Sequence, residues 1–246
     1  GRGMTVQQKY LRTVIRQQGQ SLILTNATKV RDILNESTRN NLQFEKKNGE
    51  FESVSRQDVI TRYITDSPEP SFQSPVVISF ENKRAAGYNN DIRRSLFPGK
   101  DTVTPGDRLL IIENNYNDER RGILNGEFAI VVSASEQTQR QSARVYIKNG
   151  EGKPSAVTVS LDFREVELVF EDGIHIKTMI IDSLLQNGEP SLTHPEFLAL
   201  HVNTNMRFKT NSMGLSKEEF FRRDPFYNAL KVKYGYAITA HKSQGG

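Results

Sequence analysis

The chain has 246 residues, which is enough for one large domain or two smaller ones with a buried core. Its composition, 36% hydrophobic and 25% charged, excludes wholesale disorder, and 33 Lys and Arg against 29 Asp and Glu (net charge +4) allow a polyanionic partner without requiring one. The absence of cysteine excludes disulfides and thiolate metal sites, and without a long apolar run or a signal-like start the sequence predicts a cytoplasmic protein with no membrane partner.

The first residues alternate between helical and extended patterns. Apolar residues at helical spacing predict a helix over residues 6–18. Residues 21–25 are expected to be extended, and Asn26 or Thr28 is expected to cap the helix that follows. Asn48-Gly49 is the expected turn of a hairpin.

The next stretch indicates an α/β sheet. A helix is expected over residues 55–64, begun by Ser55, and a Pro- and Ser-rich linker follows it. Residues 75–80 form a short apolar run typical of a buried parallel strand, and a helix is expected over residues 83–96. A strand followed at once by a helix is the repeating unit of α/β sheets.

The pattern then changes to short strands separated by Asn-Gly and Glu-Gly turns. The expected strands are 107–113, 127–135, 143–148, 156–160 and 165–169. Five short strands in this space predict a small barrel. Beyond the barrel, helices are expected over 177–185, 193–202 and 216–221, and 232–240 returns to strand character. A late strand that completes an early sheet implies that the barrel and the helices are an insertion.

The closing stretch AITAHKSQGG, residues 237–246, runs from a strand into a polar turn. In open α/β sheets, ligands bind at the carboxyl ends of strands, and hydroxyl, amide, imidazole and ammonium donors there suit phosphate oxygens. A solvated tail explains the same composition. The order of the residues favours the first interpretation, because the string resembles motif V of superfamily 1 helicases of the RecD-like and Dda-like branch.

The resemblance implies roles for the residues of this turn. In that family the loop lies on single-stranded DNA, which assigns nucleic-acid contact to Thr239, His241, Lys242, Ser243 and Gln244. Gly245 falls beside the ATP site.

A second string supports the same family. LRTVIRQ, residues 11–17, resembles the family's motif IV, in which an arginine reaches the γ-phosphate of ATP. That arginine falls on Arg16, with Gln17 beside it. A planar, permanently charged guanidinium suits the charge of a phosphoryl group in transfer. The alternative is that Arg16 lies on a solvated helix face.

Two central segments also match. A strand followed by N-K-x-x-x-x-Y-N resembles the segment before the family's barrel. There Lys83 and Arg84 are candidates for DNA phosphate contact, and Asn82 is expected to cap the helix. A P-G-D opening followed by N-N-Y and N-G resembles the family's inserted SH3-like barrel, in which Tyr116 stacks on a base or packs at the barrel mouth.

The resemblance implies a piece of the second motor domain of a DNA helicase, a partial RecA-like domain interrupted by an SH3-like barrel and a helical segment. The expected divisions are 1–100 and 228–246 for the RecA-like part, 101–172 for the barrel and 173–227 for the helical insertion. The whole enzyme would bind ATP and Mg²⁺ and move on single-stranded DNA, 5′ to 3′. The Walker A lysine, the Walker B acid and the motif VI arginine have no counterpart here. They would lie in the missing first RecA-like domain and beyond residue 246. We therefore expect this piece to be inactive alone and its end to be an artificial boundary or a point where the chain loses order, not a natural terminus.

Two alternatives remain open at this point. The chain is a nucleic-acid-binding module without a motor, or it is a protein-interaction domain that docks through the helical segment. The four histidines show no metal-ligand spacing, so no metal site is expected.

Overall fold

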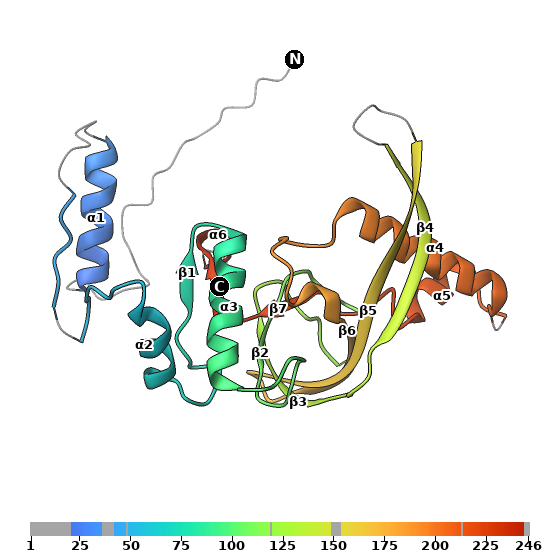
Figure 1. Ribbon diagram of the computed structural model, residues 1–246, viewed down its shortest axis with the longest axis horizontal. Coiled ribbons are helices and arrows are strands. Elements are labelled where there is room, and N and C mark those ends of the chain that lie inside the picture. Colours follow the sequence, from blue (N-terminus) through green and yellow to red (C-terminus); the bar gives the residue numbers. More distant parts are fainter. Residues whose placement is uncertain are drawn as a thin grey trace, which may run out of the picture. The chain divides into compact units, whose positions relative to one another are not determined.

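The structure is a computed structural model that describes residues 21–35, 42–47, 49–118, 120–148, 154–212 and 214–243 (Figure 1). It is a mixed α/β chain with two compact units, residues 1–58 and 59–246. Among the described residues, no helix combines the length and the apolar character that a bilayer-spanning segment needs.

In the first unit, helix α1 (Leu22–Asn35) occupies the stretch expected to begin as an extended segment. The expectation for residues 21–25 was wrong, and so was the capping role of Asn26 and Thr28, because both lie inside the helix. Asn26 bonds instead to the segment 42–46. Its amide nitrogen donates to the Glu45 carbonyl at 3.0 Å, and its oxygen accepts from the Glu45 N–H at 2.9 Å. A partner 19 residues away replaces the local cap.

The hairpin expected around Asn48-Gly49 closes with an antiparallel bridge between Lys47 and Phe51. Gly49 has a φ of 80°, a conformation that glycine adopts without a Cβ penalty. Helix α2 (Asp58–Asp66) follows, and the Asp58 N–H donates to the Ser55 hydroxyl at 3.2 Å. The helix expected over residues 55–64 is thus confirmed with a slightly later start.

The second unit contains a small parallel sheet. Strand β1 (Val77–Ser79) pairs in parallel with β8 (Ala237–Thr239), although 157 residues separate Ser79 from Ala237 in sequence, counted between the two. Helix α3 (Asn82–Leu96) follows β1 and packs on the pair (Figure 1). The expected return of the chain's end to the early strand is confirmed.

Two details of this region differ from expectation. The run 75–80 is only partly buried, because Ile78 is 60% exposed and Phe80 is 87% exposed. Among the described residues β8 is the one strand that pairs with β1, so β1 lies at the edge of its sheet. Asn82 does not cap α3, since Glu81 holds the N-cap position and makes no side-chain cap bond.

The other sheet is a curled, antiparallel half-barrel of six strands in the order β4-β5-β3-β2-β7, with β6 paired to β5. Its strands are β2 (Arg108–Ile111), β3 (Phe128–Ala134), β4 (Gln139–Lys148), β5 (Pro154–Phe170), β6 (His175–Ile181) and β7 (Val232–Tyr234). The expected all-β insertion is therefore present as an open, curled sheet.

Strands β5 and β6 correct the sequence interpretation. Residues 156–160 and 165–169, expected as two strands, belong to one strand of 17 residues. Its first part pairs with β4, and its second part pairs with β3 and β6. The helix expected over 177–185 was wrong, because 175–181 is β6 and only Asp182–Leu184 forms a short 3-10 helix, η1.

The helices after β6 agree with expectation. Helix α4 (His194–Thr210) begins at the capping box of Thr193 and Glu196, and α5 (Lys217–Arg223) begins at that of Ser216 and Glu219. Each box satisfies backbone donors at the start of its helix. The short helix α6 (Ala240–Ser243) follows β8.

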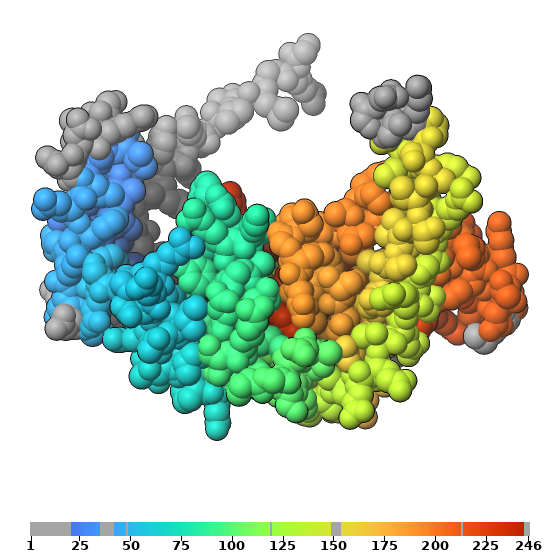
Figure 2. Space-filling view, in the orientation of Figure 1, coloured from blue at the N-terminus to red at the C-terminus, as the bar shows by residue number. Residues whose placement is uncertain are grey.

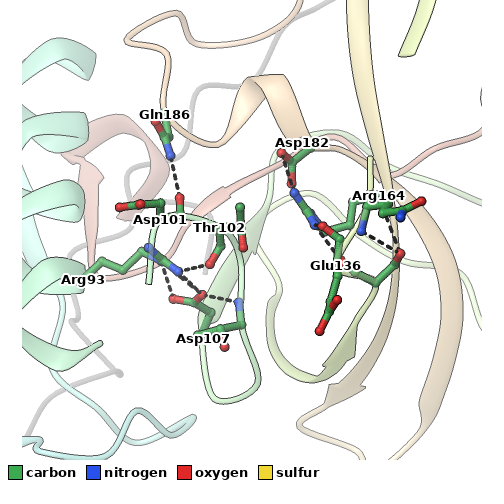
Figure 3. A network of polar contacts seen from close by, with 11 residues as sticks. Arg93, Asp101, Thr102, Asp107, Glu136, Arg164, Asp182 and Gln186 are labelled. Atoms are coloured by element: carbon green, nitrogen blue, oxygen red, sulfur yellow. Dashed lines mark hydrogen bonds and ion pairs between the residues drawn. The ribbon is translucent and has the colours of Figure 1, made fainter. Parts of the chain in front are cut away.

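Buried ion pairs join these parts within the second unit (Figure 3). The Arg93 guanidinium on α3 donates to both oxygens of Asp107 at 2.9 to 3.1 Å, and the Tyr236 hydroxyl donates to the same carboxylate at 2.7 Å. Arg164 of β5 donates to Asp182 at 2.7 Å. Asp107, from the P-G-D string, is thus a structural anchor between α3 and the half-barrel.

The two sheets share one stretch of chain. Strand β7 belongs to the half-barrel, and β8 belongs to the parallel pair, with only Gly235 and Tyr236 between them. A Cβ on Gly235 would lie 3.2 Å from the Leu109 backbone and 3.0 Å from the Phe128 ring. A side chain at this crossing would therefore have to push these neighbours aside by a few tenths of an ångström. One buried apolar cluster runs across both parts, from Ile92 of α3 to Leu168 of β5.

Candidate nucleic-acid interface

The carboxyl ends of the two parallel strands form the edge where most of the predicted contact residues meet. The register pairs Ser79 with Thr239, so α3 and α6 both start from this edge. Six predicted residues lie on the ends of β8, on α6 or on the first turn of α3: Thr239, His241, Lys242, Ser243, Lys83 and Arg84. Ligands of α/β sheets bind at such an edge.

Asn89 of α3 holds β8 in position. Its side-chain oxygen accepts from the backbone N–H groups of Tyr236 and Ala237 at 2.9 and 2.7 Å, and its nitrogen donates to the Ala237 carbonyl at 2.9 Å. The side chain is 6% exposed, so these bonds are shielded from water. Sequence reasoning included Asn89 in a motif but gave it no role.

A groove of about 500 Å³ opens at this edge. It is lined by Phe80, Asn82, Asn125, Gly126, Pro190, Thr239, His241 and Lys242. The lining combines an exposed aromatic ring, amide and hydroxyl groups, an imidazole and an ammonium group. This mixture suits a nucleic acid, because phosphates accept from the polar groups and bases stack on the ring.

A chain of hydrogen bonds links the edge to the half-barrel. The Lys242 ammonium donates to the Asn125 side-chain oxygen at 2.6 Å. The Asn125 N–H donates to the Asn114 side-chain oxygen at 2.7 Å, and the Asn114 amide donates to the Tyr116 hydroxyl at 3.0 Å. Residues that the sequence placed in separate motifs thus form one continuous polar surface. The Asn125-Gly126 turn was expected, and Gly126 has a φ of 100°.

Tyr116 lies at the far end of this surface, where its side chain is 69% exposed. It lines a hollow of about 970 Å³ that half-barrel strands and the end of α5 also line, and a second one of about 280 Å³ beside Phe197 and Tyr227. A Cβ on Gly122 would lie 3.0 Å from the Tyr116 ring, so the ring rests closely on the opposite strand of the loop. Tyr116 therefore presents an exposed aromatic ring that rests against the loop of Gly122.

Phe80 is a candidate that sequence reasoning missed. At 87% exposed, it is the most exposed of the large apolar side chains described. The apolar run before it suggested a buried strand. The available signal was its position, since it is the last residue before the polar start of α3 and side chains alternate between the two faces of a strand.

Lys83 and Arg84 are both exposed at the start of α3. The Arg84 guanidinium lies 3.4 Å from the Glu81 carboxylate, an exposed pair worth little energy. Ser243 donates its hydroxyl to the Ala240 carbonyl at 2.7 Å, so its hydroxyl proton is engaged within α6. Lys83 and Arg84 remain accessible to an anion, whereas the Ser243 hydroxyl would have to give up a bond to donate.

Burial affects two lysines at this edge. Partial burial lowers the pKa of Lys242, whose ammonium faces the groove. Below the groove, desolvation lowers the pKa of Lys233 to about 8, although the Glu189 and Glu196 carboxylates act in the opposite direction. The Lys233 ammonium donates to the Leu184 and Asn187 carbonyls at 2.6 and 3.0 Å. It therefore holds the loop after η1 against β7.

The residues assigned to ATP by resemblance, Arg16, Gln17 and Gly245, lie outside the described residues, as does Gln244. Within the described part of the chain, no group of three or more His, Asp or Glu side chains is placed to hold a metal ion. The described residues therefore include candidates for nucleic-acid contact but none of the residues assigned to ATP.

A scan against protein-family models found no match for this chain, and a search of curated protein sequences found none either.

Proposed function

We propose that this chain is part of the second motor domain of an ATP-dependent helicase that moves on single-stranded DNA. The observation that carries the proposal is the parallel pairing of β8 with β1. It puts the stretch that resembles motif V directly after a sheet strand, at the edge where α/β sheets bind ligands. A RecA-like domain with an inserted SH3-like barrel is the fold that the proposal implies.

In this proposal the DNA strand lies along the groove at the sheet edge. Lys242 and His241 contact phosphates, and Thr239 and Gln244 donate further hydrogen bonds. Phe80 and Tyr116 stack on bases at the two ends of the surface. The bond between Lys242 and Asn125 supports a continuous path, because it joins the sheet edge to the loop that carries Tyr116.

The ATP side of the proposal rests on the resemblance alone. Arg16 and Gln17 would face the nucleotide, with Gly245 near it, and the first RecA-like domain would supply the remaining ATP and Mg²⁺ ligands. Closure of the two domains around ATP would shift the hold of the Lys242 loop on the DNA. Translocation would run 5′ to 3′, as in the helicases that the sequence resembles.

The test uses the natural full-length protein and measures ATP hydrolysis with and without oligothymidylate. Replacing His241 and Gln244 by Ala should reduce DNA-stimulated hydrolysis more than basal hydrolysis, because these groups contact only the DNA. Arg16→Ala should keep DNA binding and lose most hydrolysis, since the guanidinium acts on the phosphoryl group. Arg94→Gln, on the exposed last turn of α3, is the matched control and should change neither rate.

The outcomes separate the candidate functions. Equal loss of basal and stimulated hydrolysis in the His241 and Gln244 variant would show that the loop is merely structural. Unchanged hydrolysis in Arg16→Ala would remove the role of that residue. Single-strand binding without any hydrolysis would favour the second candidate, a nucleic-acid-binding module, which the groove alone is sufficient to support.

A further inference from the structure

The hairpin of β4 and β5 has two faces of opposite character. Ten residue pairs hold Gln139–Lys148 against residues 154–163, so side chains alternate strictly between the faces. One face packs on α4 through an apolar cluster, lined by Ala143, Val145, Ile147, Val157, Val159, Leu198, Ala199 and Val202. The Asn203 amide on α4 also donates to the Ser142 carbonyl at 3.0 Å. This inner face is therefore fully used by the fold.

The opposite face, here called the outer face, is polar and basic. It consists of Arg140, Ser142, Arg144, Tyr146 and Lys148 on β4, opposite Asp162, Ser160, Thr158, Ala156 and Pro154 on β5. Figure 1 shows this hairpin extending from the half-barrel with α4 alongside it, and in Figure 2 its strands lie uncovered in the view. The fold gives the outer face no covering element among the described residues.

The charges of the outer face are unbalanced. Arg140 donates to both oxygens of Asp162 at 2.8 and 3.0 Å, which neutralises the one carboxylate on this face. Within the described part of the chain, Arg144 and Lys148 have no acidic partner. These two cations are four residues apart on the same strand, which is about 14 Å at about 3.4 Å per residue. Such a spacing suits an extended polyanion better than a single small anion.

The uncharged residues of the outer face indicate which kind of polyanion it binds. Tyr146 is 69% exposed between the two cations and offers an aromatic face to a base. Thr158, opposite Arg144, supplies a hydroxyl group diagonal to Tyr146, whereas the Ser160 hydroxyl is bonded to the Ser142 hydroxyl at 2.8 Å. The outer face carries no Leu, Ile, Val, Phe or Met, whereas the centre of a protein–protein interface is apolar. Cations for phosphates with an aromatic ring for bases match a single-stranded nucleic acid.

We propose that the outer face of the β4–β5 hairpin binds a single strand of nucleic acid, with Arg144 and Lys148 on phosphates and Tyr146 stacked on a base. This site is separate from the groove at the sheet edge and lies on a different element. Binding at this site does not require ATP hydrolysis, so this inference can be tested independently of the motor proposal.

The experiment measures the anisotropy of a fluorescein-labelled oligothymidylate with the 246-residue chain across a salt series. The double variant Arg144→Gln, Lys148→Gln should bind more weakly and lower the slope of log affinity against log salt by about 1.4, since each phosphate contact on a single strand contributes about 0.7. Tyr146→Ser should weaken binding by about 5- to 160-fold without changing that slope. Arg94→Gln removes one exposed charge elsewhere and should leave the slope unchanged. All four positions are exposed, so circular dichroism should confirm unchanged folding.

Several results would overturn the inference. One is the absence of binding by the unaltered chain at low salt, and another is an unchanged salt slope in the double variant. A third is displacement of the oligonucleotide by polyglutamate as readily as by unlabelled strand, because this would indicate that the partner is an acidic protein. Equal affinity for duplex, with no effect of Tyr146→Ser, would exclude single-strand stacking. If only Lys242→Ala weakens binding, the hairpin site fails while the motor proposal stands. If the hairpin variants weaken binding and the natural protein hydrolyses no ATP, the hairpin site stands and the motor proposal fails.

Discussion

At the scale of single residues, Asn89 and Lys233 control how the chain's end is seated. Asn89 lies on α3 beside β8, Lys233 lies on β7, and both satisfy backbone groups with a side chain. Asn89 bonds to Tyr236 and Ala237, and Lys233 bonds to the loop after η1. Neither contact is visible in a local sequence pattern, because each partner is tens of residues away or more.

Replacing Asn89 by Leu should destabilise the protein strongly. The side chain has nearly the same size, but two backbone N–H groups and one carbonyl would lose their partner in a buried place. Each such loss costs about 1–3 kcal/mol, so we expect a fall of several kcal/mol in the free energy of unfolding. Urea denaturation followed by circular dichroism measures it.

The neighbouring residue Asn90 provides the control for this change. It is only half-buried and makes no hydrogen bond with the described residues through its side chain, so Asn90→Ala should change stability by less than about 0.5 kcal/mol. Similar losses in the two variants would mean that Asn89 does not hold β8.

Lys233 should leave a signature in the pH dependence of stability. Its pKa in the folded protein, about 8, is below the ordinary value of 10.5, so between these pH values the unfolded chain binds more protons. The free energy of unfolding should therefore rise with pH across this window, by at most about 3 kcal/mol from this group. Lys233→Met should remove the rise, which the difference between the two pH profiles isolates. Parallel profiles from pH 8 to 10.5 would contradict the assignment.

At the scale of elements, the sequence correctly predicted those helices and strands that begin and end at local signals. The capping boxes at Thr193 and Ser216 start α4 and α5, and the strand–helix sequence of β1 and α3 was readable from its apolar run and its end signals. The wrong predictions occurred where an apolar run fits both the periodicity of a helix and that of a strand. Residues 177–185 contain Ile180, Ile181 and Thr178, β-branched residues that favour the strand β6 once β5 provides a partner.

The sequence predicted individual residues of the candidate site but not which of them lie close together. His241 and Lys242 were found from their order after a strand. Their neighbour Asn125, 117 residues from Lys242 in sequence, was read only as a turn residue. Phe80 was read as core because a sequence does not tell how many strands cover it. Residue types indicate chemistry, whereas only the fold brings the groups to one surface.

At the scale of the whole molecule, Gly235 is the position where the two sheets join. Gly235→Val should press on the Leu109 backbone and the Phe128 ring and lower the free energy of unfolding by about 1–3 kcal/mol, as in overpacked cores. Thermal or urea unfolding measures the change.

The matched control for this position is Gly87→Ala. Gly87 lies inside α3, and a Cβ there would contact nothing within 4 Å, so the change should stabilise by about 0.5–1 kcal/mol. Loss of stability in both variants, or none in Gly235→Val, would argue against a tight crossing.

The crossing at Gly235 also has a mechanical consequence. Force on the β4–β5 hairpin passes through the hydrogen-bonded rows β5-β3-β2-β7 and then along the covalent chain into β8. No loop in this path is long enough to act as a hinge. We therefore expect a displacement of the hairpin to be passed on to the sheet edge that bears Lys242.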